Sequence, residues 1–222
     1  VIDEQDMAVT MTHFGYIKRL SPDTYRTQRR GGRGVKGQGT REEDFVETLF
    51  VTSTHTEILF FTNLGRVLKI KCYAIPEESR AAKGTPIVNL LQLQGGEKTT
   101  AGITLPRDGS REGYLVMATR QGVIKKTPLS EFDNIRKGGI IAQNLRDGDE
   151  LIAVELSTGE DEFLIASRKG QAVRFGEADV RAMGRTATGV RAIRLDEDDE
   201  VVDMVKIRPG ATVLTVTEKG MG

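Results

Sequence analysis

A short loop rich in arginine and glycine carries the side chains of this 222-residue chain best suited to chemistry. It has the sequence Gln28, Arg29, Arg30, Gly31, Gly32, Arg33, Gly34, and Lys36 follows it. A guanidinium group offers a planar fork of donors that matches phosphate oxygens. Glycine carries no side chain that would hold backbone N–H groups away from an anion. The loop is therefore a candidate phosphate-binding site.

A repeated pattern surrounds this loop and must position it. The pattern apolar-x-apolar-Ser/Thr-x-x-Gly occurs five times, and its glycines are Gly15, Gly65, Gly122, Gly170 and Gly220. Residues two apart share one face of a strand, so the apolar pair predicts a strand with a buried face. The glycine then predicts a tight turn and a return strand. Each repeat is expected to open with a β-hairpin.

A basic side chain stands four residues after the glycine in each of the first four repeats. These residues are Arg19, Lys69, Lys126 and Arg174. They are candidate contacts for an anionic polymer, and the alternative is that they are ordinary solvated strand charges. In later repeats the place of the loop is taken by weaker versions, at Arg80–Gly84, Asn134–Gly139 and Arg185–Gly189.

The period near fifty residues, with several strands in each unit, predicts an all-β fold of propeller type. A solenoid of helix pairs is disfavoured by the period-2 alternation of the apolar residues. We expect about four four-stranded blades and the start of a fifth, in one domain over residues 1–222 that is incomplete at its C-terminus. The repeats run roughly over 7–56, 57–113, 114–162, 163–212 and, in part, 213–222. The chain begins at Val1, which suggests a fragment of a longer polypeptide.

The charge of the chain is balanced but unevenly distributed. It has 32 basic and 32 acidic residues, yet residues 16–41 contain eight basic side chains against Asp23 alone. An anionic polymer is expected to engage this sector first. The acidic stretches 160–162 and 196–200 are interpreted as solvated loops, because no ordered metal-ligand spacing accompanies them.

Other features exclude several classes of protein. A single cysteine, Cys72, allows no internal disulfide and fits a reducing compartment. There is no apolar run of about twenty residues and no leader, so we expect a cytoplasmic protein with no membrane segment. The two histidines, His13 and His55, occupy turn or loop positions, and no Walker loop is present. We expect no catalytic residue, no metal and no cofactor in this chain.

The loop and its repeat context resemble a known family. Gln28–Gly34 is similar to the box that marks the C-terminal domain of gyrase A, the DNA-cleaving component of DNA gyrase, with Arg33 where the family form has lysine. The stretches Pro86–Leu91, Asp147–Ile152 and Val180–Gly184 also read like that domain. The resemblance covers essentially the whole chain.

This resemblance implies a β-pinwheel, whose blades exchange strands with their neighbours and whose rim binds, bends and wraps duplex DNA without sequence specificity. It implies a bacterial, nucleoid-associated, ATP-dependent type IIA topoisomerase that introduces negative supercoils, with ATP and Mg needed only by the complete enzyme. The implied partners are double-stranded DNA, the remainder of gyrase A, and gyrase B in an A2B2 complex. The first blade is expected to clamp DNA through the box. The alternatives are the corresponding C-terminal domain of topoisomerase IV, or a propeller that binds other proteins.

Overall fold

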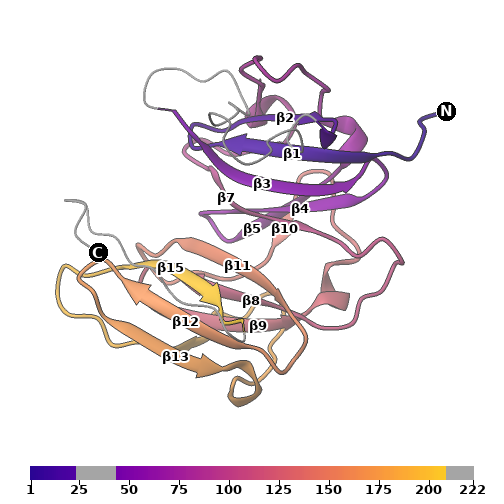
Figure 1. Cartoon of the computed structure of the whole chain (residues 1–222). Coiled ribbons are helices and arrows are strands. Elements are labelled where there is room, and N and C mark those ends of the chain that lie inside the picture. The colour runs from indigo at the N-terminus through magenta and orange to yellow at the C-terminus, as the bar shows by residue number, and fades with distance from the viewer. Residues whose placement is uncertain (24–43, 209–222) are drawn as a thin grey trace.

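The computed structural model describes residues 1–23 and 44–208, which form four antiparallel sheets that follow one another along the chain (Figure 1). The all-β array of blades expected from the repeat is confirmed. The loop Gln28–Gly34, Lys36 and the start of the fifth repeat lie outside the described residues.

Each sheet combines a hairpin, a third strand and, in the first three sheets, a short strand from the following repeat. The first sheet has the order β3-β1-β2-β6, with β1 Asp6–Thr12, β2 Tyr16–Leu20, β3 Val46–Ser53 and β6 Thr85–Pro86. The second has the order β10-β5-β4-β7, with β4 Glu57–Thr62, β5 Arg66–Lys71, β7 Thr99–Thr104 and β10 Ile140–Ile141. The third has the order β11-β8-β9-β14, with β8 Tyr114–Thr119, β9 Val123–Pro128, β11 Leu151–Ser157 and β14 Val190–Arg191. The fourth has the order β13-β12-β15 among the described strands, with β12 Glu162–Ser167, β13 Ala172–Gly176 and β15 Val201–Lys206.

The hairpin turns need glycine because their backbone is left-handed. Gly15, Gly65, Gly122 and Gly170 have φ angles of 87°, 76°, 89° and 93°. A side chain is strained in this region of backbone space, whereas glycine adopts it freely. The glycine spacing therefore marks the four described hairpins.

Strand exchange joins neighbouring sheets. After the second, third and fourth hairpins the chain passes through a short 3-10 helix, η1 Cys72–Ala74, η3 Leu129–Phe132 or η4 Glu177–Asp179, before the exchanged strand. Another 3-10 helix, η2 Ile87–Asn89, directly follows β6. The exchanged strands β6, β10 and β14 pair with β2, β5 and β9 of the preceding repeat. We call residues 72–91, 129–146 and 177–196 the crossing segments. The exchanged strands form one edge of each sheet, and β7, β11 and β15 form the other edge. Because β11 contacts β7 and β15, that second edge faces the inside of the array and the crossing segments lie on its outside.

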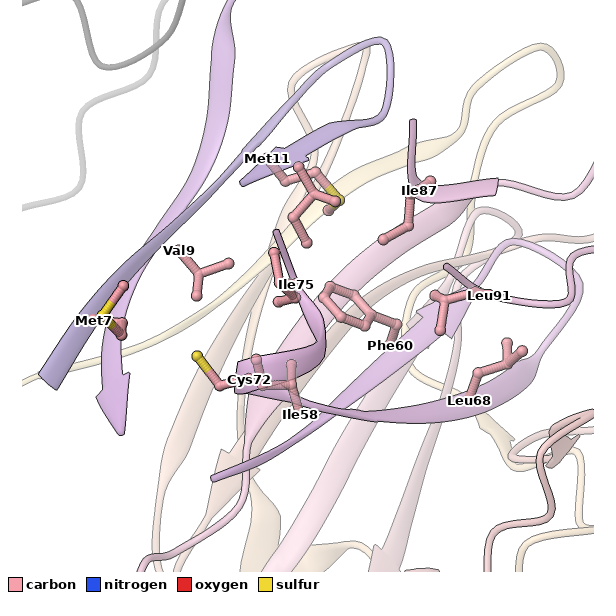
Figure 2. Packing of buried hydrophobic residues seen from close by; sticks show 11 residues of the cluster. Met7, Val9, Met11, Ile58, Phe60, Leu68, Cys72, Ile75, Ile87 and Leu91 are labelled. Atoms are coloured by element: carbon pink, nitrogen blue, oxygen red, sulfur yellow. The ribbon is translucent and has the colours of Figure 1, made fainter. Parts of the chain in front are cut away.

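The hydrophobic core lies between the sheets. Figure 2 shows the first interface, where Met7 and Val9 of β1 face Ile58 and Phe60 of β4, with Cys72 beside them. Two further clusters fill the gaps between the second and third sheets and between the third and fourth. Residues 58–62 of β4 are buried on both faces, because a sheet lies on each side.

The fourth hairpin differs from the expected pattern. Phe163 and Ile165 of β12 are buried against the third sheet, while the apolar pair of the repeat pattern, Leu164 and Ala166, is only half-buried. The pattern marks the strand correctly, but the more buried face is the other one. The burial of a face depends on the neighbouring sheet, which the local pattern does not encode.

Candidate nucleic-acid interface

Two of the four repeated basic residues are engaged inside the protein. The Arg19 guanidinium donates from Nε to the Ile75 carbonyl oxygen at 2.6 Å and pairs with Glu77 at 3.4 Å. Lys126 is only 6% exposed, and its ammonium donates to the Glu177 carbonyl oxygen at 2.9 Å. Both side chains fasten a hairpin to the crossing segment that lies beside it.

The other two pair with acidic side chains. Lys69 lies 3.0 Å from a Glu57 carboxylate oxygen, and the exposed Arg174 pairs with Glu162. A DNA phosphate would have to compete with these carboxylates. DNA contact by the four residues stays a prediction, and the geometry favours the exposed Arg174.

Sequence reasoning missed a second pair of lysines, three residues after the hairpin glycine. Lys18 and Lys125 are fully buried. Lys18 Nζ donates to the carbonyl oxygens of Ser79, Arg80 and Ala82 at 2.8, 2.9 and 3.0 Å. Lys125 Nζ donates to the carbonyl oxygens of Ala142, Gly184 and Arg185. The available signal was that Leu68 and Val173 take this position in the other two repeats, which marks it as interior.

Burial changes the acidity of both ammonium groups. Burial lowers the pKa of Lys125 to about 8, while Glu131 opposes the change and Arg185 adds to it. Burial also lowers the pKa of Lys18, against the attraction of Glu78. The three carbonyl acceptors around each ammonium replace the water that burial removes.

Basic side chains without an acidic partner gather on the crossing segments. Eight of them form no ion pair with any described residue: Arg80, Arg136, Lys137, Arg146, Arg181, Arg185, Arg191 and Arg194. All except Arg80 and Arg185 are exposed. By contrast, the paired basic residues lie on hairpins or on the loop before β8. The outside of the array therefore presents uncompensated positive charge.

Three of these arginines converge on one hollow. Arg146, Arg191 and Arg194 line a shallow depression of about 430 Å³ together with Ala192 and Ile193. The floor is held in place, because the Ala192 N–H donates to the Gly122 carbonyl oxygen at 2.8 Å and Ile193 is buried against the same turn. Three guanidinium groups around a fixed floor suit an anion with several oxygens.

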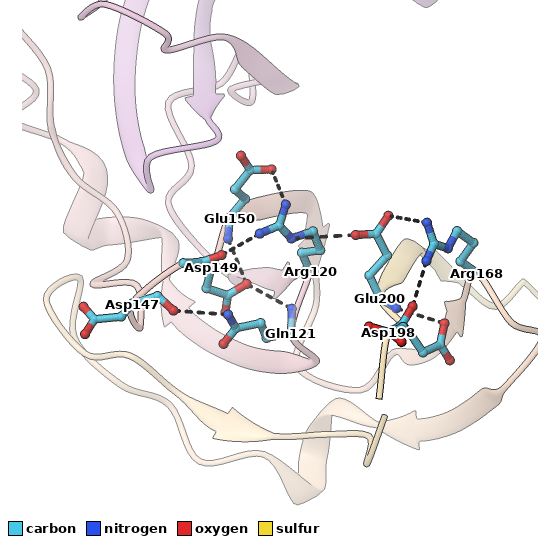
Figure 3. A network of polar contacts seen from close by, with 10 residues as sticks. Arg120, Gln121, Asp147, Asp149, Glu150, Arg168, Asp198 and Glu200 are labelled. Atoms are coloured by element: carbon cyan, nitrogen blue, oxygen red, sulfur yellow. Dashed lines mark hydrogen bonds and ion pairs between the residues drawn. The ribbon is translucent and has the colours of Figure 1, made fainter. Parts of the chain in front are cut away.

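The acidic loops neutralise the hairpin turns. Figure 3 shows the Arg120 guanidinium between Glu150 and Glu200, at 3.5 and 3.8 Å, with Arg168 on the far side of Glu200 at 3.8 Å. The interpretation of residues 196–200 as solvated is wrong for Glu200 and for Asp199, whose carboxylate accepts the Lys169 N–H at 3.0 Å. Glu150, Asp199 and Glu200 stand just before the third strands β11 and β15, which place them against the hairpin turns. At these turns the basic side chains Arg120 and Arg168 are already paired with acidic ones.

Neither a metal centre nor a membrane helix is found in residues 1–23 and 44–208. No three His, Cys, Asp or Glu side chains in that part lie where they could share a metal ion. No helix there is long and apolar enough to cross a bilayer.

Comparison with known proteins identifies close relatives. The family model described as "DNA gyrase C-terminal domain, beta-propeller" matches residues 6–53, 56–104, 113–158 and 161–208. Gyrase A of Clostridium acetobutylicum is 53% identical over 86% of this chain and 23% of its own length. Gyrase A of Klebsiella oxytoca is 49% identical over 99% of this chain and 25% of its own length. The chain thus spans about a quarter of the length of these curated relatives.

Solved structures show the same arrangement. The C-terminal domain of DNA topoisomerase IV superposes with a TM-score of 0.76 at 27% identity, and covers 94% of this chain and 63% of its own. A DNA gyrase A C-terminal domain superposes with a TM-score of 0.71 at 26% identity, and covers 92% of this chain and 66% of its own.

Proposed function

This chain belongs to the DNA gyrase C-terminal domain family, and from that premise we propose that it binds duplex DNA without sequence specificity, bends it and wraps it chirally around the outside of the sheet array. The wrap would direct negative supercoiling by the complete enzyme. The observation that carries the proposal is the set of arginines and lysines on the crossing segments that have no acidic partner among the described residues.

Such side chains suit the task physically. Contacts to phosphates position a protein on DNA and carry no sequence information. Bending a few tens of base pairs costs about 1–6 kcal/mol on elastic estimates, so many separate contacts are needed. Repetition of the crossing segment supplies such contacts at regular intervals along the array.

The role that we propose for the loop Gln28–Gly34 rests on its position in the sequence. It occupies, in the first repeat, the position that the crossing segments occupy in the later ones. We propose that its arginines and Lys36 clamp one end of the wrapped duplex while the later crossing segments guide the rest.

The chemistry of supercoiling is assigned to other parts of the enzyme. We propose that this chain serves an ATP-dependent type IIA topoisomerase in the bacterial cytoplasm, associated with the nucleoid. Its partners would be the remainder of gyrase A and gyrase B in an A2B2 complex, and ATP and Mg would act outside this chain. The identities of 47–53% to gyrase A proteins support gyrase over topoisomerase IV.

A salt titration tests the clamp. Replacing Arg29, Arg30 and Arg33 by alanine should lower the slope of log affinity against log salt by about 2–3 units, because each phosphate contact contributes about 0.9. The matched control replaces three acid-paired arginines, Arg107, Arg111 and Arg120, and should change the slope by less than about one unit. Equal slopes for the wild type and the first variant would rule out the clamp.

Closure of nicked circular DNA tests the wrap. The wild type should shift the linking number of the ligated circles in one direction, and the variant in Arg29, Arg30 and Arg33 should lose that shift. Binding without any shift in linking number would contradict chiral wrapping.

A second candidate function, contact with another protein, is supported by apolar side chains on the first sheet. Leu49 and Val51 of β3 are 54% and 57% exposed, near the exposed Phe45. Polar substitution of Leu49 and Val51 should leave DNA affinity unchanged under the DNA-binding proposal, and a loss of affinity would connect this face to the duplex.

A further inference from the structure

The turn Ser79–Ala82 is built around the buried ammonium of Lys18. The carbonyl groups of Ser79, Arg80 and Ala82 all point at Lys18 Nζ, at 2.8 to 3.0 Å. The Ala82 N–H donates to the Ser79 carbonyl oxygen at 3.1 Å and closes the turn. An ammonium has three donors, so this one is satisfied entirely from inside the turn.

This arrangement turns two backbone donors outward. The C=O and N–H of one trans peptide point in opposite directions. Because the Ser79 and Arg80 carbonyl groups face the ammonium, the N–H groups of Arg80 and Ala81 face away from it. Neither N–H donates to a described residue, and Ser79 and Ala81 are exposed. Two adjacent donors therefore point away from the ammonium on a turn whose Ser79 and Ala81 are exposed and which carries the Arg80 side chain.

The corresponding turn of the fourth repeat shows which kind of acceptor such an N–H group binds. There Lys125 Nζ holds the Gly184 and Arg185 carbonyl groups at 3.1 and 2.7 Å, and the Ala187 N–H closes the turn onto Gly184. The outward N–H of Arg185 donates to a Glu131 carboxylate oxygen at 3.1 Å. In this turn the outward N–H thus binds an anionic oxygen.

In the second repeat, no carboxylate of residues 1–23 and 44–208 accepts the corresponding N–H of Arg80. The two acidic residues that precede the turn in sequence are engaged elsewhere, since Glu78 accepts the Thr85 hydroxyl at 3.2 Å and Glu77 pairs with Arg19. The Arg80 guanidinium forms no ion pair with a described residue. Among the described residues, the half-buried Arg80 and the exposed Ser79 and Ala81 therefore have no carboxylate bound to them.

We propose that the Ser79–Ala82 turn is a phosphate-binding site, in which the backbone N–H groups of Arg80 and Ala81 and the Arg80 guanidinium hold the oxygens of one DNA phosphodiester. Lys18 is the positioning residue, because its ammonium fixes the direction of both N–H groups and never touches the phosphate. The assignment of the bound phosphate to DNA rests on the proposed function, while the anion site itself does not.

Backbone amide shifts in the whole 222-residue chain test the site directly. Titration with inorganic phosphate at constant ionic strength should produce saturable 15N–1H shifts at Arg80 and Ala81, with dimethyl phosphate giving the same pattern at higher concentration. Chloride at equal ionic strength should produce none, and Arg185 should stay unchanged. Shifts spread evenly over exposed basic residues, or none at Arg80 and Ala81, would overturn the proposal.

Two variants sharpen the test. Arg80→Ala keeps both N–H groups and should weaken phosphate binding about tenfold, since one charge-assisted contact is lost. Glu131→Ala removes the competing carboxylate from an exposed position and should give Arg185 and Thr186 a phosphate response that the wild type lacks. An unresponsive Arg185 in Glu131→Ala would contradict the anion-binding role of the turn.

Titration with a DNA duplex of about 20 base pairs distinguishes a failure of this site from a failure of the proposed function. DNA binding with no shift at Arg80 and Ala81 would overturn the site and leave the proposed function standing. Phosphate binding at Arg80 and Ala81 without any DNA binding would leave the anion site standing and overturn both its assignment to DNA and the proposed function. Lys18→Met, if it folds, should lose the Arg80 and Ala81 response while other amides keep their positions.

Discussion

The carboxylate of Asp149 accepts the backbone N–H of Gln121 at 2.9 Å, and so ties the loop before β11 to the turn of the β8–β9 hairpin. The same carboxylate oxygen accepts the Glu150 N–H at 2.8 Å. Asp44 and Asp199 repeat the contact with Phe14 and Lys169, each two residues before a third strand. In the first, third and fourth repeats, one acidic position therefore sets how the third strand enters its sheet.

Removing this carboxylate should destabilise the fold. Asp149→Ala leaves two backbone N–H groups without an acceptor and should lower the free energy of unfolding by about 1–3 kcal/mol, measured by urea denaturation. Asp147→Ala is the control, because the Asp147 side chain is exposed and only its carbonyl group accepts a hydrogen bond. Equal stability of the two variants would refute the role of Asp149.

The crossing segment enters the third sheet so closely that a methyl group cannot fit at Gly189. A Cβ there would lie 2.2 Å from the Ile124 carbonyl oxygen, and the residue has a φ of +106°. Gly170→Ala is the matched control, because Gly170 also has a positive φ, +93°, but faces open space. Strain alone should cost each variant about 1–3 kcal/mol of unfolding free energy, and Gly189→Ala should lose clearly more. A calorimetric comparison that finds equal losses would show that the close approach does not matter.

The buried Lys125 should make stability depend on pH. Its pKa of about 8 in the folded chain lies below the ordinary value of 10.5, so the unfolded chain binds more protons between these pH values. The contribution of this group to the free energy of unfolding should therefore rise with pH above about 8, by up to about 1.4 kcal/mol per pH unit. Urea denaturation of wild type and Lys125→Met at pH 7 to 10 isolates this term. A difference between the two proteins that stays constant or falls would contradict it.

The thiol of Cys72 should resist alkylation. Burial raises its pKa from 9.0 to about 11, against the attraction of Arg19. Because reaction needs the thiolate, iodoacetamide at pH 8 should react about 100-fold more slowly with the native chain than with the urea-unfolded chain. The raised pKa also means that folding loses stability as the pH rises from about 9 to 11. Rapid labelling of the native chain would show that the first interface opens readily.

The hollow lined by Arg146, Arg191 and Arg194 should contribute to DNA binding. Alanine at all three positions should lower the salt slope of affinity by about 2–3 units if each arginine neutralises one phosphate. The variant in Arg107, Arg111 and Arg120 again serves as the control. A slope that is unchanged in both variants would place the duplex elsewhere on the array.

The hairpins were predictable from sequence because glycine at a left-handed turn and alternating apolar residues are local signals. The exchanged strands were not, since Thr85–Pro86 is only two residues long and pairs with Tyr16 and Ile17 across the fold. Their existence was implied by family resemblance alone.

The interior lysines show a second limit of sequence reasoning. Lys18 stands beside Arg19, and in sequence both are strand charges of the same kind. Lys18 is buried because its ammonium donates to carbonyl groups of residues 79–82, which lie about sixty positions later in the chain. A position shared with Leu68 and Val173 is the clue that a comparison of repeats can supply.

The exchange of β6, β10 and β14 also bears on how such an array can change in length. Among the described residues, the second, third and fourth repeats each contribute one short strand to the repeat before, and the first three each accept one from the repeat after. A stretch of chain copied from one hairpin glycine to the next therefore carries both a donor strand and an acceptor edge. Duplication or loss of such a unit leaves the remaining edges matched, so the array can gain or lose whole repeats, each with its crossing segment, while every junction between sheets stays the same.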